Sequence, residues 1–520
     1  MFESEVLMEE GYDVVVVGFG LAGAIAAIEA HDAGAKVLIV EKASFPGGIS
    51  ICAGGGARIA DDSGKAFTYL KASCADTTPD AVLMVLADGA TELADYVRGL
   101  AKAVGATTKT APVRGNYALP GYETWGYIEV DQVPGFDPAL EYPHVRAEGE
   151  VNGRKMFKIA HENIRRRGIH VRLDSPIDRL WLQDREINGV MCGDHVIVAR
   201  RGVVLACGGF EASAEFQRQF WPTPLMRPVA TFGNTGDGIR MAQEAGAGLW
   251  HMWHLHGVYG FHHPHAEFKL GIRIRRMRNW IAGVPTSRPG PMSWIIVDQR
   301  GKRYMNEYDP YMQDTNHRPM ALYDPVTRSY PRIPSVLIVD AKGRELYTLC
   351  EPSYNDPEIA ARFGKLSLKD FDDQVLMTRP SLTDIADEFD LDQGAFAATI
   401  AEWNAACAIE SDHAFGRPPA SMVPIAQPPF SAAQVWPVIS NTQGGLPHDE
   451  HQRVLNSFGE PIPRLYVAGE LGSVFGHLYF SGANYSECLV GGRIAGIHAA
   501  RLVSCYSTAE GANSIRLHFQ

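Results

Sequence analysis

The chain has 520 residues, of which 46% are hydrophobic and 21% are charged, so it is long enough for two or three domains of an ordinary globular protein. Its net charge of −12 at pH 7 argues against nucleic acid as a partner. The sequence has no run of about 18 apolar residues, which excludes a helix that spans a membrane.

The cysteine and histidine patterns make disulfides, haem and metal poor hypotheses. The eight cysteines form no C-x-x-C pair and no haem-attachment motif, which predicts reduced thiols. Histidines crowd the stretch 254–265 without the cysteine or carboxylate spacing of a metal site, so we predict no metal. Residues 1–11 are acidic and unlike a signal peptide, so we expect a cytoplasmic protein.

The first strong pattern is YDVVVVGFGLAGAIAAIEAHDAGAKVLIVEK, residues 12–42. It predicts a strand, a turn with G-x-G-x-x-G spacing, a helix and a second strand, which together indicate a dinucleotide site. Gly18 permits the tight turn, Gly20 lets the backbone approach a pyrophosphate, and Gly23 lets helix and strand pack closely. The alternative is a glycine-rich turn that binds no ligand. The predicted contacts here are Gly18, Gly20, Leu21, Ala22, Gly23, Glu41 and Lys42.

A second group of glycines follows closely in KASFPGGISICAGGG, residues 42–56. Two glycine loops at this spacing suggest a cofactor that lies extended along the chain, which favours FAD over NAD. Further strand-and-turn patterns occur at 202–213, 233–247 and 464–473. The additional predicted cofactor contacts are Gly48, Ser50, Gly54, Gly55, Ile177, Ala206, Gly208, Gly209, Asp237, Gly238, Glu470, Ser486 and Leu489.

Together these segments resemble the flavoprotein superfamily of fumarate reductases, succinate dehydrogenases and 3-ketosteroid dehydrogenases. In the succinate dehydrogenase branch a histidine before the second glycine cluster carries the flavin covalently. The corresponding stretch here, GGISICAGG, has no histidine, so the resemblance implies non-covalent FAD.

The resemblance also implies a fold. We expect an α/β protein with a doubly wound, Rossmann-type FAD domain, split between residues 1–255 and 428–520. The middle, 256–427, is expected to be an inserted α+β cap that carries part of the substrate site. Within it, Phe396, Ile400 and Trp403 recur at helical spacing and predict a helix with one buried face.

Fumarate-reducing members of this superfamily use three basic positions around the flavin, and this chain resembles them at none of the three. Asn441 replaces the histidine ahead of the glycine turn, Tyr311 falls about where an arginine follows the Asn-Glu strand, and the loop HLYFSGANYSEC holds no arginine. A dicarboxylate needs charged partners when it leaves water, so the sequence predicts a poor fumarate site.

The groups that replace them resemble those of the 3-ketosteroid dehydrogenases, most closely the Δ4-(5α) branch with its Tyr-x-Ser loop. By that resemblance Tyr479 and Tyr311 are a base and its partner, and Ser481 tunes Tyr479; which tyrosine takes the proton stays open. The backbone N–H groups of Gly482 or Ala483 are expected to polarise the ketone, as an oxyanion hole does. FAD N5 is expected to take the hydride.

Each of these residues also has a structural interpretation. A tyrosine beside glycines is commonly a packing residue, and Ser481 can cap a turn. The Δ1 branch supplies a third tyrosine from a region that here holds Tyr117, Tyr122 and Tyr127, and the sequence does not choose among them.

The stretch IRIRRMRNW is unexpectedly basic for an acidic chain. One interpretation is a solvated edge of the cap. The other is an anion site in which Arg275 and Arg276 hold a substrate carboxylate or a CoA tail; Phe480 is predicted as a further substrate contact. The second interpretation favours a small oxo-acid over a bare steroid.

The leading function is therefore an FAD-dependent dehydrogenase that introduces an α,β double bond into a cyclic ketone, either a 3-oxo-steroid or a smaller compound such as 4-oxocyclohexanecarboxylate. The alternatives are a flavin-dependent enone or enoate reductase that runs the reverse reaction, and a flavin-binding module without activity. Because no haem motif is present, the expected electron acceptor is external: oxygen, a quinone or another redox protein.

Overall fold

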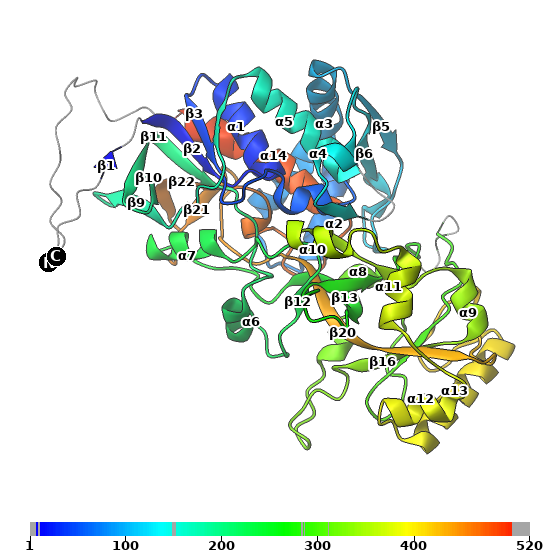
Figure 1. Cartoon of the computed structure of the whole chain (residues 1–520). Coiled ribbons are helices and arrows are strands. Elements are labelled where there is room, and N and C mark those ends of the chain that lie inside the picture. The colour runs from blue at the N-terminus through cyan, green and yellow to red at the C-terminus, as the bar shows by residue number, and fades with distance from the viewer. Residues whose placement is uncertain are drawn as a thin grey trace, which may run out of the picture.

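The computed structural model describes residues 7–8, 11–147, 152–281, 284, 287–309 and 311–501. Figure 1 shows the blue segment from near the start of the chain and the red helix from near its end packed together, above the green and yellow middle. The predicted α/β fold, with a parallel sheet built from both ends of the chain and an α+β part inserted between them, is confirmed. No helix in these described ranges is long and apolar enough to cross a membrane.

The first sheet has a parallel centre. Its strands, in spatial order, are β8 (His170–Arg172), β3 (Val37–Val40), β2 (Tyr12–Val17), β11 (His195–Leu205) and β22 (Pro461–Val467). Its remaining strands are β1 (Leu7–Met8), β9 (Arg179–Gln183), β10 (Glu186–Cys192) and β21 (Arg453–Leu455). Val14, Val15 and Val16 are fully buried, as continuous apolar strands with both faces covered require.

Two helices from opposite ends of the chain cover one face of this sheet. α1 (Leu21–Asp32) packs along α14 (Ala483–Arg501), and the backbones approach so closely that a Cβ on Gly496 would lie 2.2 Å from the Ala26 carbonyl oxygen. Because α14 begins at Ala483, this packing places the preceding loop, residues 476–482, beside the polyglycine turns.

A small antiparallel sheet flanks the loop 476–482. It consists of β4 (Ala57–Ala60), β5 (Thr107–Ala111) and β6 (Trp125–Gln132). The helices around it are α2 (Ser63–Cys74), α3 (Asp80–Ala103), α4 (Pro138–Glu141) and α5 (Asn152–Arg166). β4 follows the second glycine cluster directly, so this sheet fixes the position of that cluster.

The middle of the chain is organised by an eight-stranded sheet. Its strands are β12 (Arg227–Pro228), β13 (Leu255–His262), β14 (Gly271–Ile274), β15 (Ile295–Val297), β16 (Ser335–Val339), β17 (Cys350–Glu351), β19 (Met377–Arg379) and β20 (Phe430–Thr442). A separate pair joins β18 (Ser353–Asn355) to β7 (Val145–Ala147). β20 pairs with strands of the middle segment along its length, although the sequence assigned residues after 428 to the FAD domain.

Short helices complete the middle segment. They are α8 (Met312–Thr315), α9 (Ala341–Leu346), α10 (Pro357–Phe363), α11 (Leu368–Val375), α12 (Leu382–Glu388) and α13 (Gln393–Ala408), while α6 (Ala214–Phe220) and α7 (Asp237–Glu244) precede it. The helix predicted from apolar spacing is α13, and its buried residues include Phe396, Ile400 and Trp403. That face packs in the same core cluster as β15 and β16.

Candidate active site

A cavity of about 310 Å³ lies at the carboxyl ends of the parallel strands, where the glycine turn after β2 meets the turn after β11. Gly18 has φ +104° and its Cβ would lie 2.5 Å from the Ala206 oxygen, so this turn requires glycine. Glu41 accepts hydrogen bonds from the backbone N–H groups of Phe19 (2.8 Å) and Ala43 (2.9 Å), which hold its carboxylate at the end of β3.

A second cavity, of about 260 Å³, opens between the glycine loop, the loop before α14 and the β13–β14 side of the middle sheet. Ile49, Ser50, Glu470 and Cys488 line both cavities, so the two are adjacent along one path. Two cavities in line, both bordered by glycine backbone, fit a dinucleotide that lies extended, as the sequence predicted for FAD.

Tyr479 is placed in the second cavity by the loop before α14. Its Oη accepts a hydrogen bond from the Gly482 N–H at 3.1 Å, three residues further along the chain. Its own backbone N–H donates to Asp314 Oδ2 at 3.1 Å, which ties the loop to α8. Gly482 has φ +81° and its Cβ would lie 2.5 Å from both the Gly56 oxygen and the Tyr127 ring, so only glycine fits there.

A model of the "FAD binding domain" family matches residues 13–485. The chain belongs to this family. FAD is therefore its cofactor, and the chain is a flavin-dependent oxidoreductase.

Three curated relatives are similar to this flavoprotein over nearly its whole length. NADH:fumarate oxidoreductase from Klebsiella pneumoniae is 28% identical over 95% of the chain, which spans only 48% of that relative. 3-Oxosteroid 1-dehydrogenase from Mycobacterium tuberculosis is 25% identical, with 94% and 98% of the two chains covered. 4-Oxocyclohex-2-ene-1-carboxylate 5-dehydrogenase from Sinomonas cyclohexanicum is 25% identical, with 96% and 95% covered.

Two solved structures share the fold of this flavoprotein. The 3-ketosteroid Δ1-dehydrogenase from Sterolibacterium denitrificans has a TM-score of 0.78 at 24% identity, with 95% of this chain and 100% of that chain covered. The 3-ketosteroid Δ4-(5α)-dehydrogenase from Rhodococcus jostii RHA1 has a TM-score of 0.66 at 23% identity, with 95% and 98% covered. At these identities the two likenesses establish the fold alone.

Most of the predicted cofactor residues line the two cavities. In the flavoprotein's first cavity these are Gly18, Gly20, Leu21, Ala22, Glu41, Lys42, Gly48, Ser50, Ile177, Ala206, Gly208, Asp237 and Glu470, and in the second they include Gly54 and Gly55. Lys42 Nζ pairs with Asp237 Oδ2 at 2.6 Å across the mouth of the first cavity.

Five predicted cofactor residues do not line either cavity. Gly23, Gly209 and Gly238 allow close packing instead. A Cβ on Gly23 would lie 2.0 Å from the Gly18 oxygen, and one on Gly209 would lie 1.9 Å from Thr442 Oγ1. A Cβ on Gly238 would lie 2.6 Å from Cys207 Sγ. Ser486 donates its hydroxyl to the Arg58 carbonyl oxygen, and Leu489 is fully buried in the core beside α1.

Glu470, which borders both cavities, forms a buried carboxyl pair with Glu211. Burial raises the pKa of Glu211 to about 7. Burial and the neighbouring Glu211 carboxylate raise the pKa of Glu470 well above its ordinary value. Glu470 Oε1 accepts the Thr442 N–H at 3.1 Å, so the side chain is held at the boundary of the two cavities in a largely uncharged state.

Tyr311, from the start of α8, lies in the same cavity as Tyr479, as the sequence predicted. Its Oη is 3.3 Å from His256 Nε2, and the two rings are stacked with centroids 5.9 Å apart. His256 comes from β13 and also lies against the Tyr479 ring, with centroids 4.5 Å apart. Sequence reasoning missed His256, because the histidine crowding around it was weighed only as a metal site and rejected as one.

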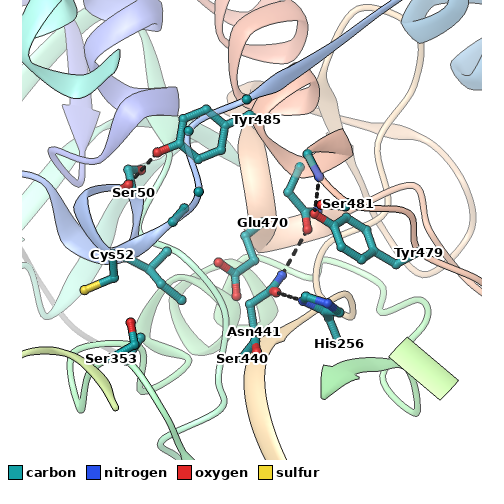
Figure 2. Close-up of a pocket in the computed structure, with 18 of the residues that line it drawn as sticks. Ser50, Cys52, His256, Ser353, Ser440, Asn441, Glu470, Tyr479, Ser481 and Tyr485 are labelled. Atoms are coloured by element: carbon teal, nitrogen blue, oxygen red, sulfur yellow. Dashed lines mark hydrogen bonds between the residues drawn. The ribbon is translucent and has the colours of Figure 1, made fainter. Parts of the chain in front are cut away.

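A chain of amides determines which nitrogen of His256 carries the proton. Glu487 Oε2 accepts from Asn484 Nδ2 (2.6 Å), and Asn484 Oδ1 accepts from Asn441 Nδ2 (3.1 Å). Asn441 Oδ1 therefore faces His256 Nδ1 at 3.0 Å, and an amide oxygen only accepts. His256 Nδ1 then carries the proton, and Nε2 presents its lone pair to the Tyr311 hydroxyl. Figure 2 shows Asn441 hydrogen-bonded to His256 beside Tyr479.

Burial dominates the ionisation of these groups. It raises the pKa of Tyr311 and of Tyr479 well above the ordinary phenol value, so both are neutral in the resting site. It lowers the pKa of His256 to about 4, so the imidazole is neutral as well. The Ser481 side chain acts on Tyr311, whose pKa it lowers against the effect of burial, and its expected effect on Tyr479 stays a prediction.

The backbone N–H groups of Gly482 and Ala483, expected to polarise the ketone, are both engaged within the protein. The Ala483 N–H donates to the Phe480 carbonyl oxygen at 3.1 Å and opens the helix, so it does not face the cavity. The Gly482 N–H points to Tyr479 Oη instead of standing alone. The donor available to a ligand is therefore the Tyr479 hydroxyl, which the Gly482 N–H orients.

The three tentative substrate residues separate in space. Phe480 is fully buried between Tyr69 and Trp125, with ring centroids at 5.0 and 4.9 Å, and does not line the cavity. Arg275 lies over the Tyr347 ring at 4.8 Å, outside the cavity. Arg276 does line the cavity, where its Nε is 3.4 Å from Glu351 Oε2.

Of the three tyrosines between which the sequence did not choose, two lie next to the site. Tyr127 lines the cavity and donates to the Ser481 carbonyl oxygen at 2.8 Å. Tyr117 donates to Asp314 Oδ2 at 2.7 Å, and its ring centroid is 6.2 Å from that of Tyr311. Tyr122 lies apart from the cavity, within 3.4 Å of an Arg114 nitrogen.

Proposed function

We propose that this flavoprotein dehydrogenates a cyclic ketone to the α,β-unsaturated ketone. One observation carries the proposal: two neutral tyrosines, one held by a backbone N–H and the other by a histidine lone pair, share a cavity that continues the dinucleotide path. The similarity to 3-oxosteroid and 4-oxocyclohexene carboxylate dehydrogenases supports it.

Tyr479 is assigned to the ketone oxygen. Its Oη already accepts the Gly482 N–H, so the hydroxyl proton is free to donate to a carbonyl placed in the cavity. The donated N–H also stabilises negative charge on Oη as the substrate oxygen takes up electron density. This arrangement lowers the barrier to removal of the α-proton, because charge on the enolate oxygen meets a preorganised donor.

In this proposal Tyr311 is the base, and Tyr479 is its partner. A phenol with a raised pKa is a weak base by itself. The His256 lone pair, 3.3 Å away, takes the Tyr311 proton as the phenolic oxygen takes the α-proton, so no free phenolate is needed. FAD, when bound, would supply the hydride acceptor that the substrate β-carbon needs.

Asp314 positions both halves of this arrangement. It accepts the Tyr479 N–H and the Tyr117 hydroxyl on one oxygen, and His254 Nε2 lies 3.3 Å from the other. His254 and Arg318 lower the pKa of Asp314 to about 2 against the effect of burial, so the carboxylate stays charged. Its charge keeps the loop before α14 anchored to α8.

The reverse reaction, reduction of an enone, uses the same residues, and the similarity to an NADH:fumarate oxidoreductase favours it as the second candidate. Fumarate itself remains a poor substrate in this proposal. Asn441 and Tyr311 occupy the positions at which the sequence predicted that basic groups are missing, and both are engaged with neutral His256. Turnover of a ketone requires an external acceptor, for which oxygen, a quinone or a redox protein remain our candidates.

The test is an anaerobic titration of the oxidised holoenzyme with a 3-oxo-5α-steroid, cyclohexanone and 4-oxocyclohexanecarboxylate. We expect loss of flavin absorbance with one of them, and a bleaching rate about 10²- to 10³-fold lower in Tyr479→Phe, the cost of removing one oxyanion donor. Bleaching by none of the ketones, together with reoxidation of the reduced enzyme by an enone, would assign the reductase instead.

A further inference from the structure

Arg273 brings a half-buried positive charge into the substrate cavity. It lies on β14, where its backbone pairs with Gly260 on one side and Glu351 on the other, and its side chain lines the cavity. Its Nε is buried and has no hydrogen-bond acceptor among the residues that the structure describes. A guanidinium that leaves water without an acceptor is costly, so a group that supplies one is expected at this point.

The Ser353 hydroxyl is a second polar group of the cavity lining without a hydrogen-bond partner among the described residues. Ser353 lies on β18, is 3% exposed and lines the cavity. Its hydroxyl lies beside the Cys52 thiol, and within the described ranges no oxygen or nitrogen partner reaches it at hydrogen-bond length. Figure 2 shows Ser353 and Cys52 on the side of the cavity away from Tyr479 and His256.

The other charged groups around the cavity are already balanced. Arg276 pairs with Glu351, and Glu129 pairs with Lys109 at 3.4 Å. Burial and its partner carboxyl raise the pKa of Glu470, which favours its uncharged form. Among the described cavity residues, Arg273 is thus the cation with neither an ion pair nor a hydrogen bond.

We propose that Arg273 and Ser353 bind a substrate carboxylate, so that the ketone is a small cyclic oxo-acid held at both ends. This inference rests on the proposed function: the ketone oxygen lies at Tyr479 and the carboxylate at the opposite wall. A guanidinium and a hydroxyl give a carboxylate the charge-assisted donors that it loses on leaving water. Arg273 replaces the Arg275 and Arg276 pair that the basic stretch suggested.

The size of the cavity agrees with a monocyclic acid. Its volume of about 260 Å³ is below the roughly 300–1,000 Å³ typical of ligand pockets. Gly54, Gly55 and Glu470, which the sequence assigned to the cofactor, border the same space. A substrate that shares this volume with part of the cofactor is a single ring rather than a steroid nucleus.

The test measures binding apart from chemistry. Cyclohexanecarboxylate, which has the acid but no ketone, is titrated calorimetrically into wild-type holoenzyme and into Arg273→Met, Ser353→Ala and Arg275→Met. We expect Kd to rise about 10- to 100-fold in Arg273→Met and less in Ser353→Ala, the range for losing charge-assisted hydrogen bonds. Arg275→Met is the matched control, because it makes the same substitution at an arginine outside the cavity. It should bind cyclohexanecarboxylate as the wild type does.

Kinetics supply the second readout. KM for 4-oxocyclohexanecarboxylate should rise by the same factor in Arg273→Met, while KM for cyclohexanone stays unchanged. Equal effects on both ketones, equal weakening in Arg275→Met, or no binding of cyclohexanecarboxylate to wild type would overturn the proposal. Should Arg273→Met fail to fold, Ser353→Ala and Arg273→Lys carry the same comparison.

The two proposals fail in different ways. If the acid binds in an Arg273-dependent manner but no ketone bleaches the flavin, the anion site stands and the dehydrogenase function falls. If ketones bleach the flavin and Arg273→Met leaves acid binding unchanged, the function stands and the anion site is refuted.

Discussion

The pairing of Tyr311 with His256 leads to a prediction about the pH dependence of the reaction. We consider His256→Gln, which keeps a polar side chain on β13 but lacks the imidazole lone pair that faces Tyr311 at 3.3 Å. In this variant Tyr311 must lose its own proton to solvent before it can accept the α-proton. The wild type avoids this step, because His256 takes the proton directly.

The size of the effect follows from the ionisation of a phenol. Burial raises the pKa of Tyr311 above the ordinary value of 10, so at pH 7, three units below that value, less than about one molecule in 10³ holds a phenolate. We expect the bleaching rate of His256→Gln to fall by about 10²- to 10⁴-fold at pH 7, the ordinary range of general-base assistance, which corresponds to about 3–5 kcal/mol in the barrier.

The pH profile distinguishes this role from a structural one. His256 has its pKa lowered to about 4 by burial, with Asp314 and Asn441 acting in the opposite direction and Arg273 and His254 adding to the lowering. Its lone pair is thus available at every pH above about 4, and the wild-type rate should be flat from pH 5 to pH 9. In His256→Gln the rate should instead rise about tenfold per pH unit, because the phenolate fraction does so.

The assay is stopped-flow bleaching of the oxidised flavin by a saturating ketone at each pH, with flavin content and Tm measured in parallel. His262→Gln is the matched control, since His262 lies on the same strand, stacks on Trp436 at 4.8 Å and does not line the cavity. If the pH profile of His256→Gln is as flat as that of the wild type, the assignment of His256 as the acceptor of the Tyr311 proton is refuted, whatever the absolute bleaching rate of the variant.

Two further predictions concern stability. Burial raises the pKa of Glu211 and so favours its protonated form in the folded state; this contribution to the free energy of unfolding is present below pH 4.5 and is lost as the pH rises through the raised pKa. Urea unfolding should show a flatter pH dependence in Glu211→Gln, and an unchanged one in exposed Glu215→Gln. Gly18→Ala should lower the free energy of unfolding by more than about 2 kcal/mol and release FAD on gel filtration, because its Cβ meets the Ala206 oxygen at 2.5 Å. Gly34→Ala, with φ +86° but nothing within 4 Å of its Cβ, should lose only about 1–2 kcal/mol and keep its flavin; equal losses in both variants would contradict the steric argument.

Features that are local in the chain could be predicted from the sequence. The turn after β2 needs glycine at Gly18 whatever surrounds it, because φ is positive there, and the spacing to Glu41 follows from one strand, one helix and one more strand. The Tyr479–Gly482 contact is equally local, since it spans three residues of one loop. Such patterns are legible in a sequence because the chain itself sets the distances.

The distant residues that meet those local features could not be predicted, because the fold brings them together. His256, Tyr311 and Asn441 are separated by 55 to 185 residues, and their contact depends on how β13 pairs with β20 and how α8 packs on β13. No periodicity or motif encodes that pairing, so the sequence could place Tyr311 near Tyr479 only by resemblance and gave no sign of His256.

The basic stretch shows the same limit within a few residues. The sequence shows that Arg273 and Arg275 are close in the chain, but not which one faces the cavity. Pairing of β14 with both β13 and β17 directs Arg273 inward, whereas Arg275 lies beyond the end of the strand and covers Tyr347. The orientation of a side chain depends on the neighbours that the fold brings to it, and for these two arginines those neighbours come from segments as distant as residues 347–351.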